Sequence, residues 1–264
     1  MIDLHSHVLP GVDDGPADLE GSLALARAAV AAGTTLMVAT PHVNHDHDVQ
    51  PTAIHDAVER LRWELDRNGI ALELRPGAEI ALSRMTTLTE SELASMRLGG
   101  GPYLLLESPF TSAVGDLEKI VFELRLSGHE VLLAHPERCP AFQRDPGLLR
   151  RLVDKGALVS ITAGSMTGDF GGTVRRFCLD LLAEGLVHDV ASDAHDDDRR
   201  PPGVAGAFEA AERELPGVSD RREWLTQLVP AAILAGERLP APPPPPGRAR
   251  GGWRKLTRRG RRAT

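Results

Sequence analysis

The stretches that decide the fold are Asp3-Leu4-His5-Ser6-His7 and Ala191-Ser192-Asp193-Ala194-His195. Each is a short run that ends with acidic and histidine side chains on alternate residues. Because successive side chains of a strand point to opposite faces, Asp3, His5 and His7 are expected on one face. The same holds for Asp193 and His195, and imidazole and carboxylate groups are common ligands of Zn, Mn and Fe. The matching chemistry predicts a closed barrel whose first and last strands meet around metal.

Between these stretches, runs typical of buried strands alternate with runs typical of helices. Seven strands are expected, at residues 2–8, 34–40, 70–75, 103–107, 129–135, 157–162 and 186–192, and two helices follow the last strand, near 204–215 and 220–234. Such alternation indicates parallel strands joined by right-handed crossovers. An α/β fold of the TIM-like barrel type fits better than an open doubly wound sheet, because ligands lie at both ends of the series and no G-x-G-x-x-G follows the first strand.

Length and composition are those of one large domain with a substantial core: 264 residues, 42% hydrophobic and 4% aromatic. The two cysteines, Cys139 and Cys178, are too few for a disulfide framework and indicate a reducing compartment. The N-terminus lacks the pattern of a signal peptide, and no apolar run approaches the roughly 20 residues of a membrane span. We therefore expect a cytoplasmic location.

The net charge of −7 is unevenly distributed along the chain. Residues 240–264 contain a polyproline run and eight of the 30 basic residues, with no acid, which leaves 22 basic against 37 acidic residues in the rest. A strongly acidic body disfavours nucleic acid as a partner. We expect residues 1–239 to form the folded domain and residues 240–264 to be a disordered basic tail. That tail either holds the protein weakly at an anionic membrane or only increases its solubility.

Side chains at the C-terminal ends of barrel strands carry the chemistry of such folds. Nearly every predicted strand ends with a nitrogen or oxygen ligand: His5, His7, Asp14, His42, Glu79, Glu107, His135, Asp193 and His195. Any one of these residues alone is explained equally well as a polar side chain with ordinary hydrogen bonds. Nine in register are hard to explain in that way, because unpaired buried carboxylates are costly. They exceed one tetrahedral site, so we expect two or three ions that share bridging carboxylates, with Mn, Fe or Zn as the metal.

The remaining histidines are assigned other places. His129 and His188 fall at strand beginnings, at the wrong end of the barrel, and are expected to be structural. His55 is expected on a helix surface. His45 and His47 lie in a loop near the rim, where contact with metal or substrate stays open.

Two arginines indicate the substrate class. Guanidinium groups at Arg138 and Arg200, beside metals, suit a phosphate, which they bind bidentately. The alternatives are that Arg138 only pairs with Glu137 or another acid, and that Arg199 takes the place of Arg200. Metals activate water and stabilise negative charge, so these residues predict phosphomonoester hydrolysis. A cysteine-based mechanism is not expected, because the gap from Cys139 to the next arginine is one residue short, and no G-x-S-x-G occurs.

The opening, residues 3–15, resembles that of the PHP (polymerase and histidinol phosphatase) domain proteins, and more narrowly their bacterial protein-tyrosine phosphatase branch of the CpsB/CapC type. The segments 39–42, 77–79, 133–138, 161–165 and 192–195 are similar to that branch as well. Asp14 and Glu107 favour this branch over the histidinol-phosphatase-like and polymerase-type branches. The resemblance covers residues 1–239, and the tail is an addition of this chain.

The resemblance implies a distorted (β/α)7 barrel of the PHP type with a trinuclear site, usually of manganese. It implies a first ion held by His5, His7, Glu79 and Asp193, a second held by Glu79, Glu107 and His135, and a third held by Asp14, His42 and His195. It also implies that Arg138 and Arg200 bind phosphate.

The function implied by the resemblance is that of a hydrolase, a metal-dependent protein-tyrosine phosphatase of capsule and exopolysaccharide synthesis. Its expected partner is a phosphotyrosine protein, a membrane-associated tyrosine autokinase. The alternatives are a small-molecule phosphatase of the histidinol-phosphatase-like kind and an inactive metal-binding scaffold. Whether the chain forms a homo-oligomer stays open.

Overall fold

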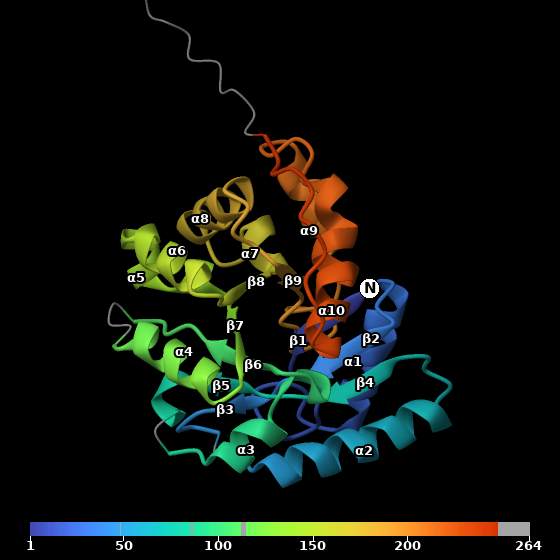
Figure 1. Ribbon diagram of the computed structural model, residues 1–264. Helices are drawn as coiled ribbons and strands as arrows, with labels where there is room; N and C mark the ends of the chain where they lie inside the picture. The colour runs from blue at the N-terminus through green and yellow to red at the C-terminus, as the bar shows by residue number, and fades with distance from the viewer. Residues whose placement is uncertain (48, 86, 112–114, 248–264) are drawn as a thin grey trace, which may run out of the picture.

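The computed structural model describes residues 1–47, 49–85, 87–111 and 115–247, in which a set of parallel strands is surrounded by helices (Figure 1). One sheet has the order β1-β2-β4 and the other the order β3-β5-β6-β7-β8-β9. The strands are β1 (Ile2–Ser6), β2 (Leu36–Ala39), β3 (His42–Val43), β4 (Glu73–Pro76), β5 (Glu79–Ala81), β6 (Tyr103–Glu107), β7 (Glu130–Ala134), β8 (Leu158–Thr162) and β9 (Asp189–Ala191). All the pairings between them are parallel, as the alternation of the sequence predicts.

The two sheets are joined where two strands of the barrel break. β2 and β4 pair with each other, whereas the segments that follow them, β3 and β5, pair within the second sheet. Pro41 stands in the first break and has no N–H to donate. Gly77 stands in the second, where a Cβ atom would lie 2.9 Å from Val38 Cγ1, so only glycine allows the chain to pass so closely. The breaks distort the barrel. The strands predicted at 34–40 and 70–75 correspond to β2 and β4, whereas the short strands β3 and β5 beyond the breaks were not predicted.

The barrel closes between its first and last strands. Asp193 N donates to His5 O at 2.9 Å, and His7 N donates to Ala194 O at 2.8 Å. A parallel bridge joins Ser6 to Ala194. The prediction that these two stretches meet is confirmed, and they bring ligand residues from positions almost 190 residues apart into contact.

Helices follow the strands along the chain and cover the outside of the sheets (Figure 1). They are α1 (Leu19–Ala31), α2 (Pro51–Arg67), α3 (Glu90–Ser95), α4 (Leu117–Leu126), α5 (Pro140–Arg144), α6 (Pro146–Asp154), α7 (Ala163–Thr167), α8 (Gly172–Ala183), α9 (Ala205–Glu212) and α10 (Val229–Ala235). Helical turns are η1 (Leu82–Arg84), η2 (Leu98–Gly100), η3 (Pro136–Arg138), η4 (Ser219–Arg221) and the π-helical η5 (Trp224–Leu228).

Local sequence explains where these helices begin and how they pack. Asp18 caps α1 by accepting a hydrogen bond from Gly21 N at 3.0 Å, which satisfies one of the free donors of the first turn. In α2 the buried residues Ile54, Val58 and Leu61 recur every three or four positions and face the core. The helix expected near 220–234 is divided into η4, η5 and α10.

The C-terminal segment returns to the body before the described part of the chain ends. Trp224 Nε1 donates to Pro240 O at 3.2 Å, and Pro246 is buried. Residues 248–264, most of the expected basic tail, lie outside the described residues, so the domain boundary at 239 stays a prediction. Among the helices that the structure describes, none has the length and apolar character of a membrane span.

Candidate metal centre

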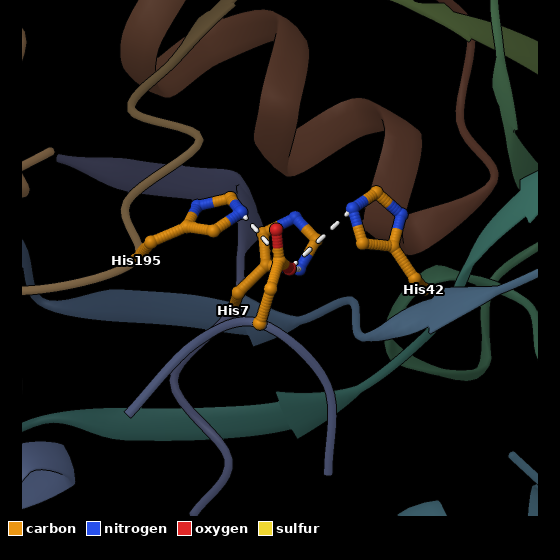
Figure 2. A group of neighbouring side chains, drawn as sticks. His7, His42 and His195 are labelled. Carbon is orange, nitrogen blue, oxygen red and sulfur yellow. Dashed lines mark ion pairs between the residues drawn. The ribbon is translucent and has the colours of Figure 1, made fainter. Parts of the chain in front are cut away.

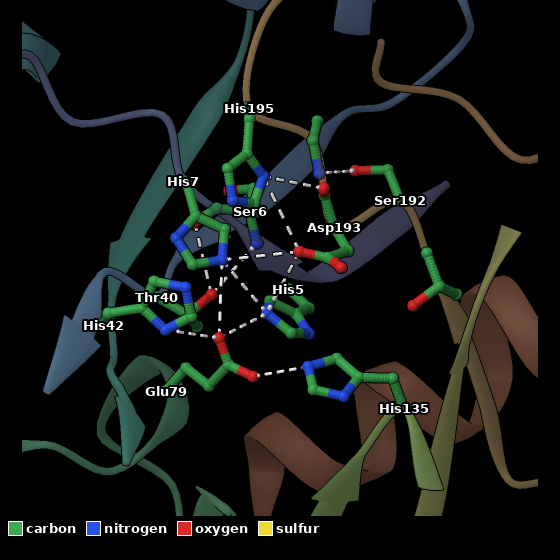
Figure 3. Close-up of polar contacts among 12 residues, drawn as sticks. His5, Ser6, His7, Thr40, His42, Glu79, His135, Ser192, Asp193 and His195 are labelled. Atoms are coloured by element: carbon green, nitrogen blue, oxygen red, sulfur yellow. Dashed lines mark hydrogen bonds and ion pairs between the residues drawn. The ribbon is translucent and has the colours of Figure 1, made fainter. Parts of the chain in front are cut away.

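Strand ends deliver the ligand side chains, and two of those residues have an uncommon backbone. His135 follows β7 with a φ of 35°, and Asp193 follows β9 with a φ of 53°. Residues other than glycine rarely adopt this left-handed region, which is strained for L side chains. Both residues turn the chain sharply at the barrel end, and their side chains point at the same centre, as Figure 3 shows. Backbone strain concentrated at two candidate ligands is typical of a functional site.

His5 in β1 and His7 directly after it lie against two carboxylates, Glu79 and Asp193, from other parts of the barrel. His5 Nε2 and His7 Nε2 are 3.2 Å apart, a spacing that leaves room for only one proton between them. His5 Nε2 lies 3.2 Å from Glu79 Oε2, and His7 Nε2 lies 3.4 Å from Asp193 Oδ1. Four donor atoms thus converge from β1, β5 and the end of β9.

Glu79 is the centre of the arrangement. Its Oε1 atom lies 2.6 Å from His135 Nε2, and its Oε2 atom lies 3.0 Å from His42 Nδ1 (Figure 3). The residue is fully buried, at 0% exposure. Glu107 shares a group of potential ligand atoms with Glu79 and His42. One carboxylate therefore contacts side chains from both halves of the centre, as a bridging ligand does.

Asp14 occupies the outer side of the centre. Its Oδ1 atom lies 3.3 Å from His195 Nε2 and 3.6 Å from His42 Nε2, and its side chain is 52% exposed. Figure 2 shows His195 and His42 on either side of His7. The chain brings these four residues together from the ends of β1 and β9 and from β3.

All nine predicted ligands fall into four overlapping groups whose ligand atoms lie within 4.8 Å of one another. The groups are His7, Asp14, His42 and His195; His5, His7 and Asp193; His5, Glu79 and His135; and His42, Glu79 and Glu107. Glu79 Oε2 and His42 Nδ1, although 3.0 Å apart, form no hydrogen bond of suitable geometry, and neither does the buried His195 Nε2. Buried polar atoms are ordinarily paired. These nitrogen and oxygen atoms face one another without hydrogen bonds, as atoms that coordinate metal ions do. Their arrangement fits metal ions shared between the groups.

The carboxylates of the centre have opposed electrostatic environments. Burial opposes the ionisation of Glu79, but the nearby His5 and His135 outweigh it and hold its pKa well below the ordinary value. Burial raises the pKa of Glu107 to about 7, and the negative charge of Glu79 adds to the rise. Two acids that repel each other at such short range favour a cation between them.

A second layer of acids orients the ligands. Asp13 Oδ2 lies 2.6 Å from His7 Nδ1 and also accepts a hydrogen bond from His42 N at 3.0 Å. A carboxylate on the far nitrogen fixes the imidazole so that its other nitrogen faces the centre. Asp3 is buried, and Ser192 N donates to it at 3.1 Å, so it holds the last strand rather than joining the ligand groups. The sequence reasoning did not assign Asp13 a role, although its position beside Asp14 was the available signal.

The two predicted arginines meet at Asp193. Arg138 Nη1 donates to Asp193 Oδ2 at 2.9 Å, and Arg200 Nη2 forms an ion pair with the same atom at 2.7 Å. Arg199 lies 3.6 Å from Asp196 instead, and its side chain is 87% exposed. Of the two adjacent arginines, Arg200 is therefore the one that faces the centre.

Glu137 is not the partner of Arg138, which pairs with another acid, Asp193, so the alternative that this arginine pairs with an acid stays open. Its carboxylate accepts hydrogen bonds from Thr162 N at 2.9 Å and Ser165 Oγ at 2.7 Å. Burial raises the pKa of Glu137 to about 7. The residue ties the loop after β7 to the end of β8, which positions His135.

Two phenylalanines that the sequence reasoning missed flank Arg138. Its Cζ atom lies 4.8 Å from the ring centre of Phe110 and 4.3 Å from that of Phe170. Phe110 also stacks on His135, with ring centres 5.4 Å apart. An isolated phenylalanine in a loop gives no sequence signal for such a role.

The other histidines have the places expected of them. His129 Nε2 lies 2.7 Å from Glu90, and His188 Nδ1 accepts a hydrogen bond from Val159 N at 3.2 Å. His55, on α2, lies 2.9 Å from Ser95 O. His45 is exposed, whereas the ring of His47 stacks on that of His42 with centres 5.9 Å apart. Only His47 comes near the centre, and it is not in the four ligand groups.

Comparison with known proteins relates this architecture to one family. The family model for capsular polysaccharide synthesis, CpsB/CapC, matches residues 1–226. The chain is 40% identical over 199 residues to the tyrosine-protein phosphatase YwqE of Bacillus subtilis, which covers 74% of this chain and 77% of that protein.

Solved structures agree with this relation. A structure from the work on YwqE of Bacillus subtilis and CpsB of Streptococcus pneumoniae, described as unique metal-dependent tyrosine phosphatases, matches with a TM-score of 0.80 and 34% identity, over 94% of this chain and 100% of that chain. The dihydropyrimidinase of Brevibacillus agri matches with a TM-score of 0.52 and 13% identity, over 88% of this chain and 70% of that chain. This second likeness concerns the barrel fold alone.

Proposed function

The chain belongs to the CpsB/CapC family, and from that premise we propose that it is a metal-dependent protein-tyrosine phosphatase. The single observation that carries the proposal is the convergence of nine nitrogen and oxygen ligand residues on one barrel end. Two arginines point at the same place. A cation centre beside guanidinium groups suits a phosphomonoester, whose charge both neutralise.

The four ligand groups suit two to three ions. As the family resemblance implies, His5, His7, Glu79 and Asp193 are assigned to one ion, Glu79, Glu107 and His135 to a second, and Asp14, His42 and His195 to a third. The third set lies within one ligand group, whereas the geometry groups His135 with His5 and Glu79, and Glu107 with His42 and Glu79. The donor set of imidazole and carboxylate favours Mn²⁺, with Fe or Zn as the alternatives. When bound, such ions activate water and stabilise the charge of the phosphoryl group.

The arginines are assigned to the phosphate. Each guanidinium group has five N–H donors, and Asp193 Oδ2 accepts a hydrogen bond from Arg138 Nη1 and forms an ion pair with Arg200 Nη2. Donors remain on both for phosphate oxygens. Asp193 holds the two guanidinium groups close together, so both can contact the phosphate dianion. The tyrosine hydroxyl has a pKa of about 10. Tyrosinate is therefore a good leaving group and needs little help from a proton donor.

The substrate proposed for this activity is a phosphotyrosine protein of capsular polysaccharide synthesis, namely a membrane-associated tyrosine autokinase. The family description supports the pathway. A cytoplasmic location fits both the two unpaired buried cysteines and such a partner. The basic residues of 248–264 are proposed to add a weak contact with an anionic membrane, which would keep the enzyme near the kinase.

The experiment that tests the proposal compares two substrates on Mn²⁺-loaded protein. A phosphotyrosine peptide and histidinol phosphate are hydrolysed side by side, and kcat/KM is measured for each. The proposal predicts a clear preference for the peptide. A preference for histidinol phosphate would support the small-molecule phosphatase instead, and loaded protein without turnover of either would support an inactive scaffold.

A further inference from the structure

A cavity opens beside the metal centre, between α7 and α9. Its volume is about 340 Å³, and Asp193 and Arg200 are part of its lining. These two residues also belong to the centre itself. The cavity is therefore continuous with the place proposed for the phosphate.

The cavity has a mixed lining, in which Phe170, Pro201 and small residues lie beside the charged side chains of Asp169, Asp193, Arg199 and Arg200. Phe170 forms one wall, and its ring centre lies 4.3 Å from Arg138 Cζ and 6.0 Å from Arg200 Cζ. Gly164 contributes from α7 and Gly206 from α9. A flat group attached to a phosphate at the two arginines would thus find an aromatic face on one side and free space on the other.

A second cavity of about 340 Å³ lies on the other side of Arg200. Its lining residues are Asp14, His195, Asp196, Arg199 and Arg200. All of these side chains are polar or charged, so burying an aryl ring there would desolvate them without compensation. Arg199 and Arg200 line both cavities, but only the one between α7 and α9 has an aromatic ring, Phe170, in its described lining, and so of these two it suits an aryl group better.

We propose that the cavity between α7 and α9 binds the aryl group of the substrate, with Phe170 as the ring against which it packs. Aromatic rings prefer offset or edge-to-face contact with centres about 4.5 to 7 Å apart, which the open cavity allows. The inference rests on the proposed placement of the phosphate at Arg138 and Arg200. Within the proposed phosphotyrosine activity, it assigns the aryl ring to this cavity and identifies Phe170 as a residue that determines specificity.

The test uses two competitive inhibitors that differ only in the ring, phenylphosphonate and methylphosphonate. Wild-type, metal-loaded protein should bind the phenyl compound about tenfold more tightly, because the ring leaves water for an apolar wall. Gly206→Leu should bring the ratio of the two inhibition constants close to one by filling the cavity. A Cβ atom at Gly206 meets no heavy atom within 4 Å, and leucine is a better helix former than glycine, so the variant should fold.

Ala210→Leu is the matched control, since Ala210 is exposed on the same helix and does not line the cavity. It should keep the wild-type ratio. Phe110→Leu separates the two effects of aromatic removal, because Phe110 also contacts Arg138 but lies outside the cavity lining. Phe170→Leu should lower the phenyl preference, and Phe110→Leu should leave it unchanged.

Three results would overturn the inference. The first is an unchanged ratio in Gly206→Leu, which would mean that the ring does not use the cavity. The second is an equal loss of affinity for both inhibitors in Gly206→Leu, or an equal loss of the phenyl preference in Phe110→Leu and Phe170→Leu. Either outcome would mean that these residues affect only the position of the phosphate. The third is a wild-type protein that binds neither phosphonate, in which case the phosphate placement itself is wrong.

Discussion

Replacing the carboxylate of Glu79 by an amide should separate a bridging ligand from a buried structural acid. In Glu79→Gln the size is kept and the negative charge is lost. Both carboxylate oxygens now contact imidazoles, at 2.6 Å from His135 Nε2 and 3.0 Å from His42 Nδ1, and His5 Nε2 lies at 3.2 Å. Glu79 also belongs to two of the four ligand groups. The substitution therefore weakens two ion positions at once.

The magnitude follows from the place of the residue. Loss of a group that only supports a ligand typically weakens metal affinity 10- to 100-fold. Glu79 is itself a shared ligand, so we expect metal affinity and kcat/KM to fall by about 100-fold or more, equivalent to ~2.7 kcal/mol. Metal content per chain is measured by elemental analysis after dialysis, and turnover is measured with a phosphotyrosine peptide.

Glu90→Gln is the matched control, because Glu90 contacts His129 Nε2 at 2.7 Å far from the ligand groups. The same chemical change at a carboxylate–imidazole pair should leave metal content and turnover within about twofold, as expected for an exposed pair. If Glu79→Gln also kept its metal and its rate, Glu79 would not be a bridging ligand and the assignment of the ions would be wrong.

Three further predictions concern the arginines, a buried acid and the tail. Arg138→Ala and Arg200→Ala should keep the metal and lower kcat/KM by about 100-fold, because they remove charge-assisted contacts to the phosphate. Arg199→Ala, the control, should change kcat/KM by less than about twofold. Loss of metal together with activity in the first two variants would contradict this prediction. Burial raises the pKa of Asp189 to about 8, so the folded state binds a proton that the unfolded state releases above about pH 4, and stability should fall as pH rises between these values. Asp189→Asn should flatten that fall in urea unfolding at fixed metal concentration, and parallel curves for variant and parent would refute the assignment. Deleting residues 248–264 should leave metal content and hydrolysis of a small phosphotyrosine substrate unchanged and reduce sedimentation with anionic liposomes at low salt; full-length protein that does not sediment would exclude the membrane contact.

The sequence was sufficient for the parallel barrel and for its closure. Alternating strand and helix patterns restrict the topology strongly, and the repeated Asp/His pattern indicated which strands meet. The short strands β3 and β5, which follow the breaks, were not predicted. Segments this short after Pro41 or Gly77 do not read as strands, and their pairing in the second sheet depends on tertiary packing such as the close approach of Gly77 to Val38.

The candidate site shows the same division. The clustering of the candidate ligands could be predicted because strand direction places strand-end residues at one end of the barrel. The choice of Arg200 over Arg199 needed coordinates, since adjacent residues of a loop have no periodicity. The contacts of Asp13, Phe110 and Phe170 depend on tertiary packing alone, and so they appear only in the structure.

The most direct test of the account is a metal titration of phosphotyrosine hydrolysis. Protein stripped by a chelator is given increasing equivalents of Mn²⁺, and bound metal and kcat/KM on a phosphotyrosine peptide are measured together. We predict that the stripped protein is inactive and that activity rises with metal until two to three ions are bound per chain. Full activity in the stripped protein, or full metal loading with no hydrolysis of the peptide, would contradict the claim that this centre is the catalytic site of a metal-dependent tyrosine phosphatase.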